Sequence, residues 1–82
     1  MKIVQFNDGS YGIRQRFWFT YSFLNITEFL ETGTIEWLLM YWDNNTQTKQ
    51  VCYKCKYKDL DLVIQTYKTI KNPKKYDIGR VV

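Results

Sequence analysis

The sequence predicts an α+β fold, in which an antiparallel sheet of four to five strands packs one face against a C-terminal amphipathic helix over about 59–71. Apolar and polar residues alternate along much of the chain before residue 59, and this is the period of a strand. From Asp59 on, apolar residues recur at the period of a helix. Strands followed by one helix are typical of the α+β class, and we expect a single domain over 1–82.

Residues 2–6 and 11–14 are predicted to pair as a hairpin, because Asp8-Gly9 between them provides the positive backbone angles of a tight turn. A second tight turn is expected around 14–16, since one strand over 11–24 would be long for so small a domain. The alternative is a strand that runs straight through. In both cases we expect the alternation over 11–24 to persist.

This alternation divides the side chains of 11–24 between the two faces of a sheet. We expect the C-terminal helix to cover the apolar face, and water to meet the polar face. The apolar face holds Tyr11, Ile13, Phe17, Phe19, Tyr21 and Phe23, whereas the polar face holds Arg14, Arg16, Thr20 and Ser22, with Trp18 among them.

A short helix is predicted near 26–32. Asn25 is a suitable N-cap, Glu28 follows it by three residues, and Gly33 suits the helix exit. A strand extension followed by a turn is the alternative for this segment.

Two further strands are predicted in the middle of the chain. Residues 35–42 are apolar at nearly every position, which indicates a central strand buried on both sides. Residues 47–58 alternate again. Their apolar side holds Val51, Tyr53, Cys55 and Tyr57, and their polar side holds Gln50, Lys54, Lys56 and Lys58, with Cys52 as the exception.

The C-terminal helix is predicted from a single apolar stripe. Asp59 is a suitable N-cap, and Asn72-Pro73 ends the pattern. The stripe consists of Leu60, Val63, Ile64, Tyr67 and Ile70.

The tail over 74–82 alternates weakly. This pattern is compatible with either a short last strand or a tail draped over the domain.

The net charge of +4 is unevenly distributed along the chain. From residue 43 on there are nine basic against four acidic side chains, whereas before it there are three against four. Such asymmetry indicates an anionic partner, although lysine-rich faces also keep small proteins in solution. No run of about 18 apolar residues occurs, and the first ten residues are not an apolar leader. We therefore expect no membrane span, no signal peptide and a cytoplasmic location.

Catalysis is not expected. The chain has no histidine, and it contains no phosphate-binding loop, nucleophile elbow or recognisable carboxylate pair. Cys52 and Cys55 have the spacing of a metal knuckle or redox pair, but they supply only half of a zinc site and follow a strand pattern. We expect two unrelated reduced thiols, no catalytic residue, no metal and no cofactor.

Two surfaces are candidates for binding. Arginine and tryptophan are enriched at the energetic centres of protein interfaces, so the first comprises Arg14, Arg16 and Trp18. The second is a lysine row that would attract a nucleic-acid backbone. It comprises Lys54, Lys56 and Lys58, joined by Lys74, Lys75 and Arg80. For both surfaces the alternative is a strand face that is exposed to water and has no binding role.

The hairpin pattern of 2–6, Asp8-Gly9 and 11–14, with the aromatic run through Leu24, resembles a loose group of short uncharacterised proteins from phages and other mobile elements. The resemblance covers about the first third of the chain. It implies a setting in which small proteins bind and block host machinery, including defence nucleases such as CRISPR effectors. Many such inhibitors are acidic mimics of nucleic acid, and this basic chain departs from that pattern.

The expected function is therefore that of a non-catalytic binding module that occupies a macromolecular surface. We expect an inhibitor of host defence, such as an anti-CRISPR protein, or of host nucleic-acid machinery, whose partner is a host protein or a protein–nucleic-acid complex. The alternative is a basic nucleic-acid-binding protein that uses the lysine strand and the basic tail.

Overall fold

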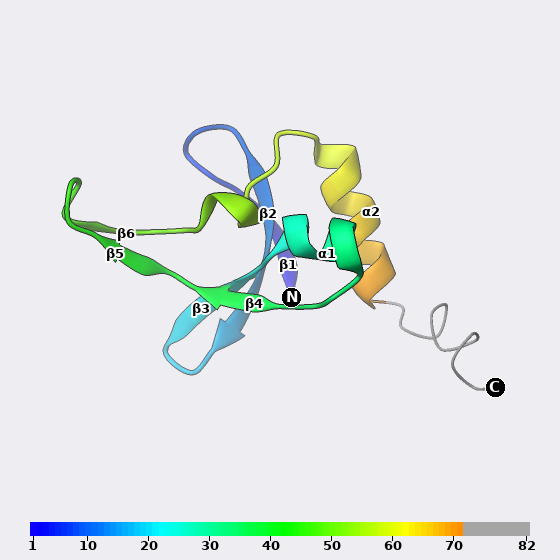
Figure 1. The fold of residues 1–82 in the computed structure, drawn as a ribbon, viewed down its shortest axis with the longest axis horizontal. Helices are drawn as coiled ribbons and strands as arrows, with labels where there is room; N and C mark the ends of the chain where they lie inside the picture. The colour runs from blue at the N-terminus through cyan, green and yellow to red at the C-terminus, as the bar shows by residue number, and fades with distance from the viewer. Residues whose placement is uncertain (72–82) are drawn as a thin grey trace.

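The computed structural model describes residues 1–71 and is drawn as a ribbon in Figure 1. The predicted last strand, or draped tail, over 74–82 lies outside the described residues. The elements in chain order are β1 (Lys2–Gln5), β2 (Tyr11–Phe17), β3 (Thr20–Leu24), α1 (Ile26–Thr32), β4 (Trp37–Leu39), β5 (Tyr41–Asp43), β6 (Thr48–Gln50), the 3₁₀ turn η1 (Tyr53–Cys55) and α2 (Leu60–Lys71).

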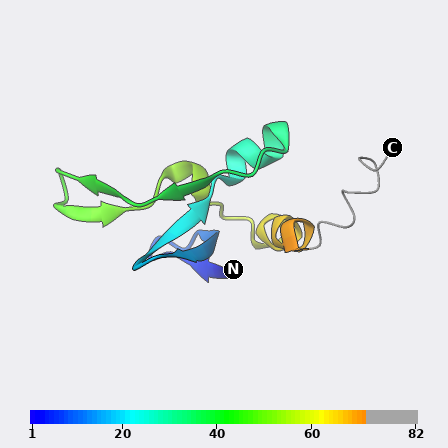
Figure 2. The same cartoon turned by 90° about the horizontal axis from the view of Figure 1, so that it is seen from below.

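Strands β1 to β4 form an antiparallel sheet in the order β1-β2-β3-β4, and β5 pairs with β6 in a separate two-stranded sheet. The β5–β6 hairpin, called here the arm, extends away from the side where α2 lies (Figure 2). The prediction of an α+β fold with an antiparallel sheet, a C-terminal helix and a short helix is confirmed.

The core lies between α2 and one face of the sheet. Ile13 in β2 is fully buried against Val63 in α2, because α2 packs across β1 and β2. Burial of such aliphatic side chains is the main stabilising contribution, at about 1.5–3 kcal/mol each. Leu24 and Ile26 complete the buried cluster, and Ile3, Tyr11, Trp37, Tyr57, Tyr67 and Ile70 pack around it.

Both helices begin at the residues that the sequence indicates. The Asn25 side-chain oxygen accepts a hydrogen bond from the Glu28 backbone N–H at 3.1 Å, which caps α1. The Asp59 carboxylate accepts one from the Leu62 N–H at 3.3 Å, which caps α2. Each cap satisfies a backbone donor that has no partner within the first turn of the helix.

The pairing of the first hairpin is confirmed, but its turn is looser than predicted. Strands β1 and β2 pair from Lys2 opposite Arg14 to Gln5 opposite Tyr11, so residues 6–10 form the loop. Gly9 has a positive φ of +88° whereas Asp8 does not, and the Gly9 N–H donates to the Phe6 carbonyl at 3.0 Å. The hydroxyl and backbone N–H of Ser10 donate hydrogen bonds to Asp8, which lowers the pKa of that carboxyl below its usual value.

The second turn does not lie at 14–16, and this prediction is wrong. Strand β2 continues to Phe17, and the chain reverses through the two residues Trp18 and Phe19 before β3. Because β2 continues past 14–16, Arg14 and Arg16 both pair with β3. A turn at 14–16 would have prevented this pairing. The reversal contains no residue type that favours turns, so the sequence does not indicate where the chain reverses.

The position of this turn changes which side chains share a face. Residues directly opposite each other in an antiparallel pair point to the same side of the sheet. Arg14 lies opposite Phe23, and Arg16 lies opposite Tyr21. Tyr21 and Phe23 therefore join the arginine face, so the predicted division of 11–24 is wrong beyond the turn. Accordingly, α2 packs over Ile13 but not over Phe17, Phe19 or Tyr21, three side chains that are exposed.

Residues 35–42 do not form one central strand buried on both sides, as was predicted. The segment divides into β4 and β5, and β4 pairs only with β3 because β5 leaves the sheet to pair with β6. An edge strand has one neighbour, so its side chains remain accessible. Ile35, Leu39, Tyr41 and Trp42 are all exposed.

The strand predicted over 47–58 is also shorter than expected. Strand β6 ends at Gln50, and the backbone N–H of Cys55 donates to the Cys52 carbonyl at 2.9 Å, which closes the η1 turn. Cys55 is fully buried, and its thiol lies 3.6 Å from the Phe23 carbonyl. Burying this side chain beside β3 takes the chain out of the strand conformation.

Gly12 is the position where this packing is tightest, so we expect Gly12→Ala to destabilise the fold by about 1–3 kcal/mol. A Cβ there would lie 2.7 Å from a ring carbon of Phe6 and 2.8 Å from the Cys55 carbonyl oxygen, which is backbone. Urea denaturation of Gly12→Ala beside the exposed-strand control Gln5→Ala measures the difference. Equal stability of the two variants would contradict the close approach.

Candidate functional site

The β2–β3 hairpin ends in three exposed aromatic side chains, and we call residues 17–19 the hairpin tip. Phe17 is 47% exposed, Trp18 is 77% exposed and Phe19 is 97% exposed. In Figure 1 this hairpin projects beyond the rest of the sheet. Apolar surface that stays in water does not stabilise the fold, so folding alone does not explain why three large aromatic side chains are exposed at the tip.

The backbone of the tip is strained. Trp18 has a φ of +55°, whereas Phe19 does not have a positive φ, and this is the φ pattern of a type II′ turn. That first position favours glycine, and a bulky residue there costs on the order of 1–3 kcal/mol. The Arg16 Nε donates a hydrogen bond of 3.4 Å to the Trp18 carbonyl, which helps to hold the turn.

One face of the hairpin behind the tip is basic, and we call it the arginine face. Lys2 lies opposite Arg14 across β1 and β2, and the Arg14 guanidinium lies over the Tyr21 ring at 4.0 Å. Arg16 lies opposite Tyr21 and is exposed. Met1, Lys2, Arg14, Gln15, Arg16 and Tyr21 line a hollow of about 230 Å³ on this face.

The other face of the hairpin is apolar and carries a second hollow, of about 310 Å³. The Ser22 side chain in it is buried, and its hydroxyl has no hydrogen-bond partner among the described residues. The hollow is lined by Gln15, Phe17, Ser22, Trp37 and Leu39. Sequence reasoning missed this surface because it placed 35–42 inside the sheet.

Of the predicted site residues, the structure brings Arg14 and Arg16 together on one face and places Trp18 in the turn beyond them. Sequence reasoning missed two contributors. Lys2 joins them across the strand pair, and Phe19 lies beside Trp18 in the turn. The signal that could have found Lys2 is the first hairpin itself, since its register already places residues 2 and 14 opposite each other.

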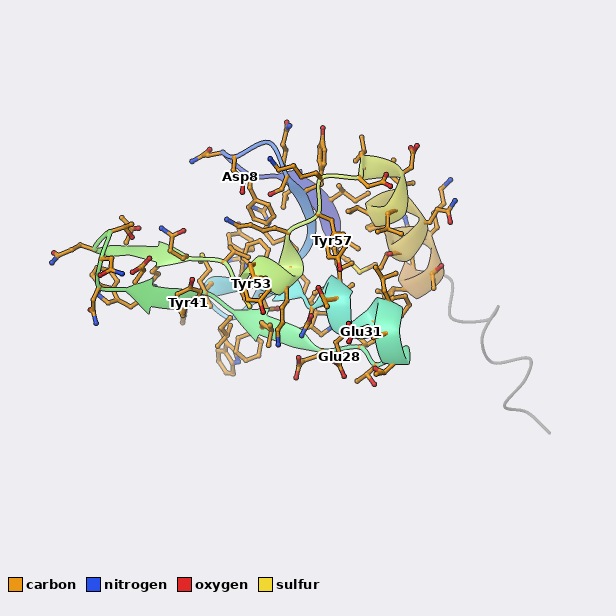
Figure 3. The ribbon with its side chains drawn as sticks, turned by 45° about the horizontal axis from the view of Figure 1, so that its top comes forward. Asp8, Glu28, Glu31, Tyr41, Tyr53 and Tyr57 are labelled. Atoms are coloured by element: carbon orange, nitrogen blue, oxygen red, sulfur yellow. The ribbon has the colours of Figure 1, made fainter. Side chains whose placement is uncertain are left out.

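The lysine row expected on a strand over 54–58 is not formed, because η1 takes Lys54 out of the strand conformation. Lys56 lies 3.9 Å from the Asp8 carboxylate, and its ammonium group is 5.1 Å from the centre of the Phe6 ring. Its charge is therefore engaged within the first hairpin, whose Asp8 is labelled in Figure 3. Lys54 and Lys58 are exposed. The other predicted members, Lys74, Lys75 and Arg80, lie outside the described residues.

The two cysteines occupy different environments. Burial raises the pKa of the Cys55 thiol to about 12, which keeps it protonated and unreactive near neutral pH. Cys52 is half-buried, and neither cysteine takes part in a disulfide. Within residues 1–71 there is no group of three or more cysteine or acidic side chains that could hold a metal ion.

None of the helices in the described part of the chain has the length and apolar character needed to cross a bilayer. No protein-family model, no curated protein and no solved structure matches the chain.

Strain at the tip predicts that Trp18→Gly stabilises the fold by up to about 1 kcal/mol. Relief of a positive φ exceeds the entropic cost of glycine, which is about 0.5–1 kcal/mol. Phe19→Gly is the matched control, because φ is not positive there, and we expect it to lose about 0.5–1 kcal/mol. Thermal or urea denaturation measures both, and a destabilised Trp18→Gly would show that the turn is not strained.

The buried thiol predicts how stability depends on alkaline pH. The folded Cys55 keeps its proton up to a pKa of about 12, whereas the unfolded chain loses it near the ordinary value of 9.0. The folded state therefore binds more protons between these values, and stability falls as pH rises through this window. Cys55→Ala serves as the reference, because this variant lacks the thiol. Under reducing conditions, we expect a shallower alkaline decline for the variant, and equal slopes would contradict the assignment.

Proposed function

We propose that this protein is a non-catalytic binding module that acts by inserting its hairpin tip into the surface of a macromolecular partner. The proposal keeps the class expected from the sequence, which is an inhibitor of host defence or of host nucleic-acid machinery. It places the main contact on Trp18 and Phe19, with Arg16 beside them.

The single observation that supports the proposal most strongly is the exposure of the two turn residues. Trp18 and Phe19 are 77% and 97% exposed, at the end of a hairpin that projects from the sheet. Aromatic side chains of this kind supply large contact area at low conformational cost and dominate the energetics of protein interfaces. Their apolar surface contributes to binding when a partner removes it from water.

The strained backbone supports the same proposal. A glycine at position 18 would form the turn without strain, so the tryptophan is retained at a cost to stability. Strained residues gather at sites of binding and catalysis, where the side chain compensates for the unfavourable backbone. Since the chain has no histidine and no catalytic motif, binding accounts for this tryptophan better than catalysis.

The rest of the hairpin provides the surroundings that such a contact needs. Arginine, like tryptophan, is enriched at the centres of interfaces. Arg16 lies two residues from Trp18, and its Nε donates a hydrogen bond to the Trp18 carbonyl. The apolar hollow on the other face, lined partly by Phe17 and Leu39, extends the contact surface beyond the tip. The hairpin thus combines a projecting aromatic tip with a basic face on one side and an apolar face on the other.

The experiment is affinity capture from host lysate with the wild type, the tip variant W18S/F19S and the control W42S/Y53S. The control also removes two exposed aromatic side chains, but from the arm and from η1. A captured protein is then purified, and its affinity for each variant is measured by calorimetry. We expect the tip variant to lose on the order of 2 kcal/mol or more, and the control to stay near the wild type.

Circular dichroism and thermal denaturation confirm that all variants fold. If the captured partner is an enzyme, the wild type and the control should inhibit it, and the tip variant should not. Equal loss of affinity in the tip and control variants, or none in either, would contradict the proposal.

A further inference from the structure

We infer that the arginine face is a binding site for the phosphate backbone of a single-stranded nucleic acid, with Lys2, Arg14 and Arg16 as the phosphate-binding side chains. The inference rests on the proposed function, and it specifies the partner as a protein–nucleic-acid complex whose exposed single strand the hairpin contacts. It differs from the nucleic-acid surface expected from the sequence, which was the lysine row.

The three cations gather on one face through the strand register. Lys2 and Arg14 lie directly opposite each other, and Arg16 follows Arg14 by two residues on the same side of β2. Together they border the 230 Å³ hollow, with the Tyr21 ring among them. Three positive charges therefore surround one accessible depression.

This arrangement is electrostatically unfavourable for the isolated protein. Like charges directly opposite in an antiparallel pair destabilise a sheet. In the described part of the chain, the one ion pair is that of Lys56 with Asp8, so no described carboxylate neutralises Lys2, Arg14 or Arg16. Glu28 and Glu31 lie on α1, away from these strands (Figure 3). An anionic ligand would relieve this repulsion, which is the charge complementarity that points to phosphate.

Arg14 is positioned in advance for such a ligand. Its guanidinium lies over the Tyr21 ring at 4.0 Å, and it donates no hydrogen bond to another described residue. Stacking restricts the guanidinium plane but leaves the N–H groups at its edge free for two oxygens of a phosphate. A side chain ordered before binding loses less entropy on binding.

The aromatic tip distinguishes a single-stranded nucleic acid from other polyanions. Proteins that bind single strands combine a positive groove for the backbone with aromatic side chains on which bases stack. Trp18 and Phe19 are exposed next to the arginine face, and Arg16 is hydrogen-bonded to Trp18. A duplex keeps its bases stacked inside, and an acidic peptide has no bases, so neither uses both parts of the hairpin.

The test is fluorescence anisotropy with a labelled oligothymidylate of about 16 nucleotides, which spans one site. K2Q/R16Q removes two charges from the arginine face, and K49Q/K68Q removes two from β6 and α2. In about 50 mM salt we expect K2Q/R16Q to weaken binding roughly 10-fold or more and the control to change it less than about 2-fold. The slope of log affinity against log salt should become shallower by about 1–2 in K2Q/R16Q alone.

Three results would overturn the inference. They are equal weakening by the two variants, absence of oligothymidylate binding by the wild type in low salt, and displacement of the oligonucleotide by polyglutamate or duplex DNA at equal charge concentration. Arg14→Gln, whose loss of stacking on Tyr21 affects stability, is measured as a further variant, with its fold checked by circular dichroism.

The outcomes for the inference and for the proposed function are distinguishable. If W18S/F19S loses a captured partner while K2Q/R16Q keeps full oligothymidylate affinity, the inference falls and the proposed function stands. If K2Q/R16Q loses the oligonucleotide while no partner depends on the tip, the proposed function falls and phosphate binding by the arginine face stands.

Discussion

The register between β2 and β3, set by the two-residue turn at Trp18 and Phe19, is the constraint on which the rest of the structure depends. It places Leu24 on the face of Ile13, where both are buried with Val63 of α2. It also places Tyr21 on the face of the arginines, where its ring supports Arg14. A shift of one residue would exchange these faces, exposing the core and burying the charges.

Burial is uneven along this sheet. Near Ile13 and Gly12 both faces are covered, one by α2 and the other by Phe6 and η1. Towards the hairpin tip, each face opens instead into a hollow lined by described residues. Stability is therefore concentrated at one end of β2 and β3, and the other end presents the aromatic and basic groups. A rigid base with an exposed tip suits a binding element, because the tip needs little ordering when it meets a partner.

Much of the fold was predictable because its signals are local. The caps at Asn25 and Asp59, the Asp8-Gly9 turn and the apolar stripe of α2 each depend on residues within a few positions of one another. The errors arose where a distant contact decides the outcome. Burial of Cys55 beside β3 ends the predicted strand over 47–58, and pairing with β6 removes β5 from the sheet. For the candidate site, the residue types at positions 14, 16 and 18 were found, but not their neighbours across the strands.

The sequence by itself determined the α+β class, the first hairpin, both helices and the presence of arginine and tryptophan in one strand pair, because periodicity and capping are properties of neighbouring residues. Only the tertiary structure decided which faces those side chains occupy. An alternating pattern assigns sides within one strand, but its meaning across a reversal depends on where the chain turns. Two aromatic residues gave no indication of a turn there, so the placement of Tyr21 on the face of Arg14 and Arg16 emerged from strand pairing alone.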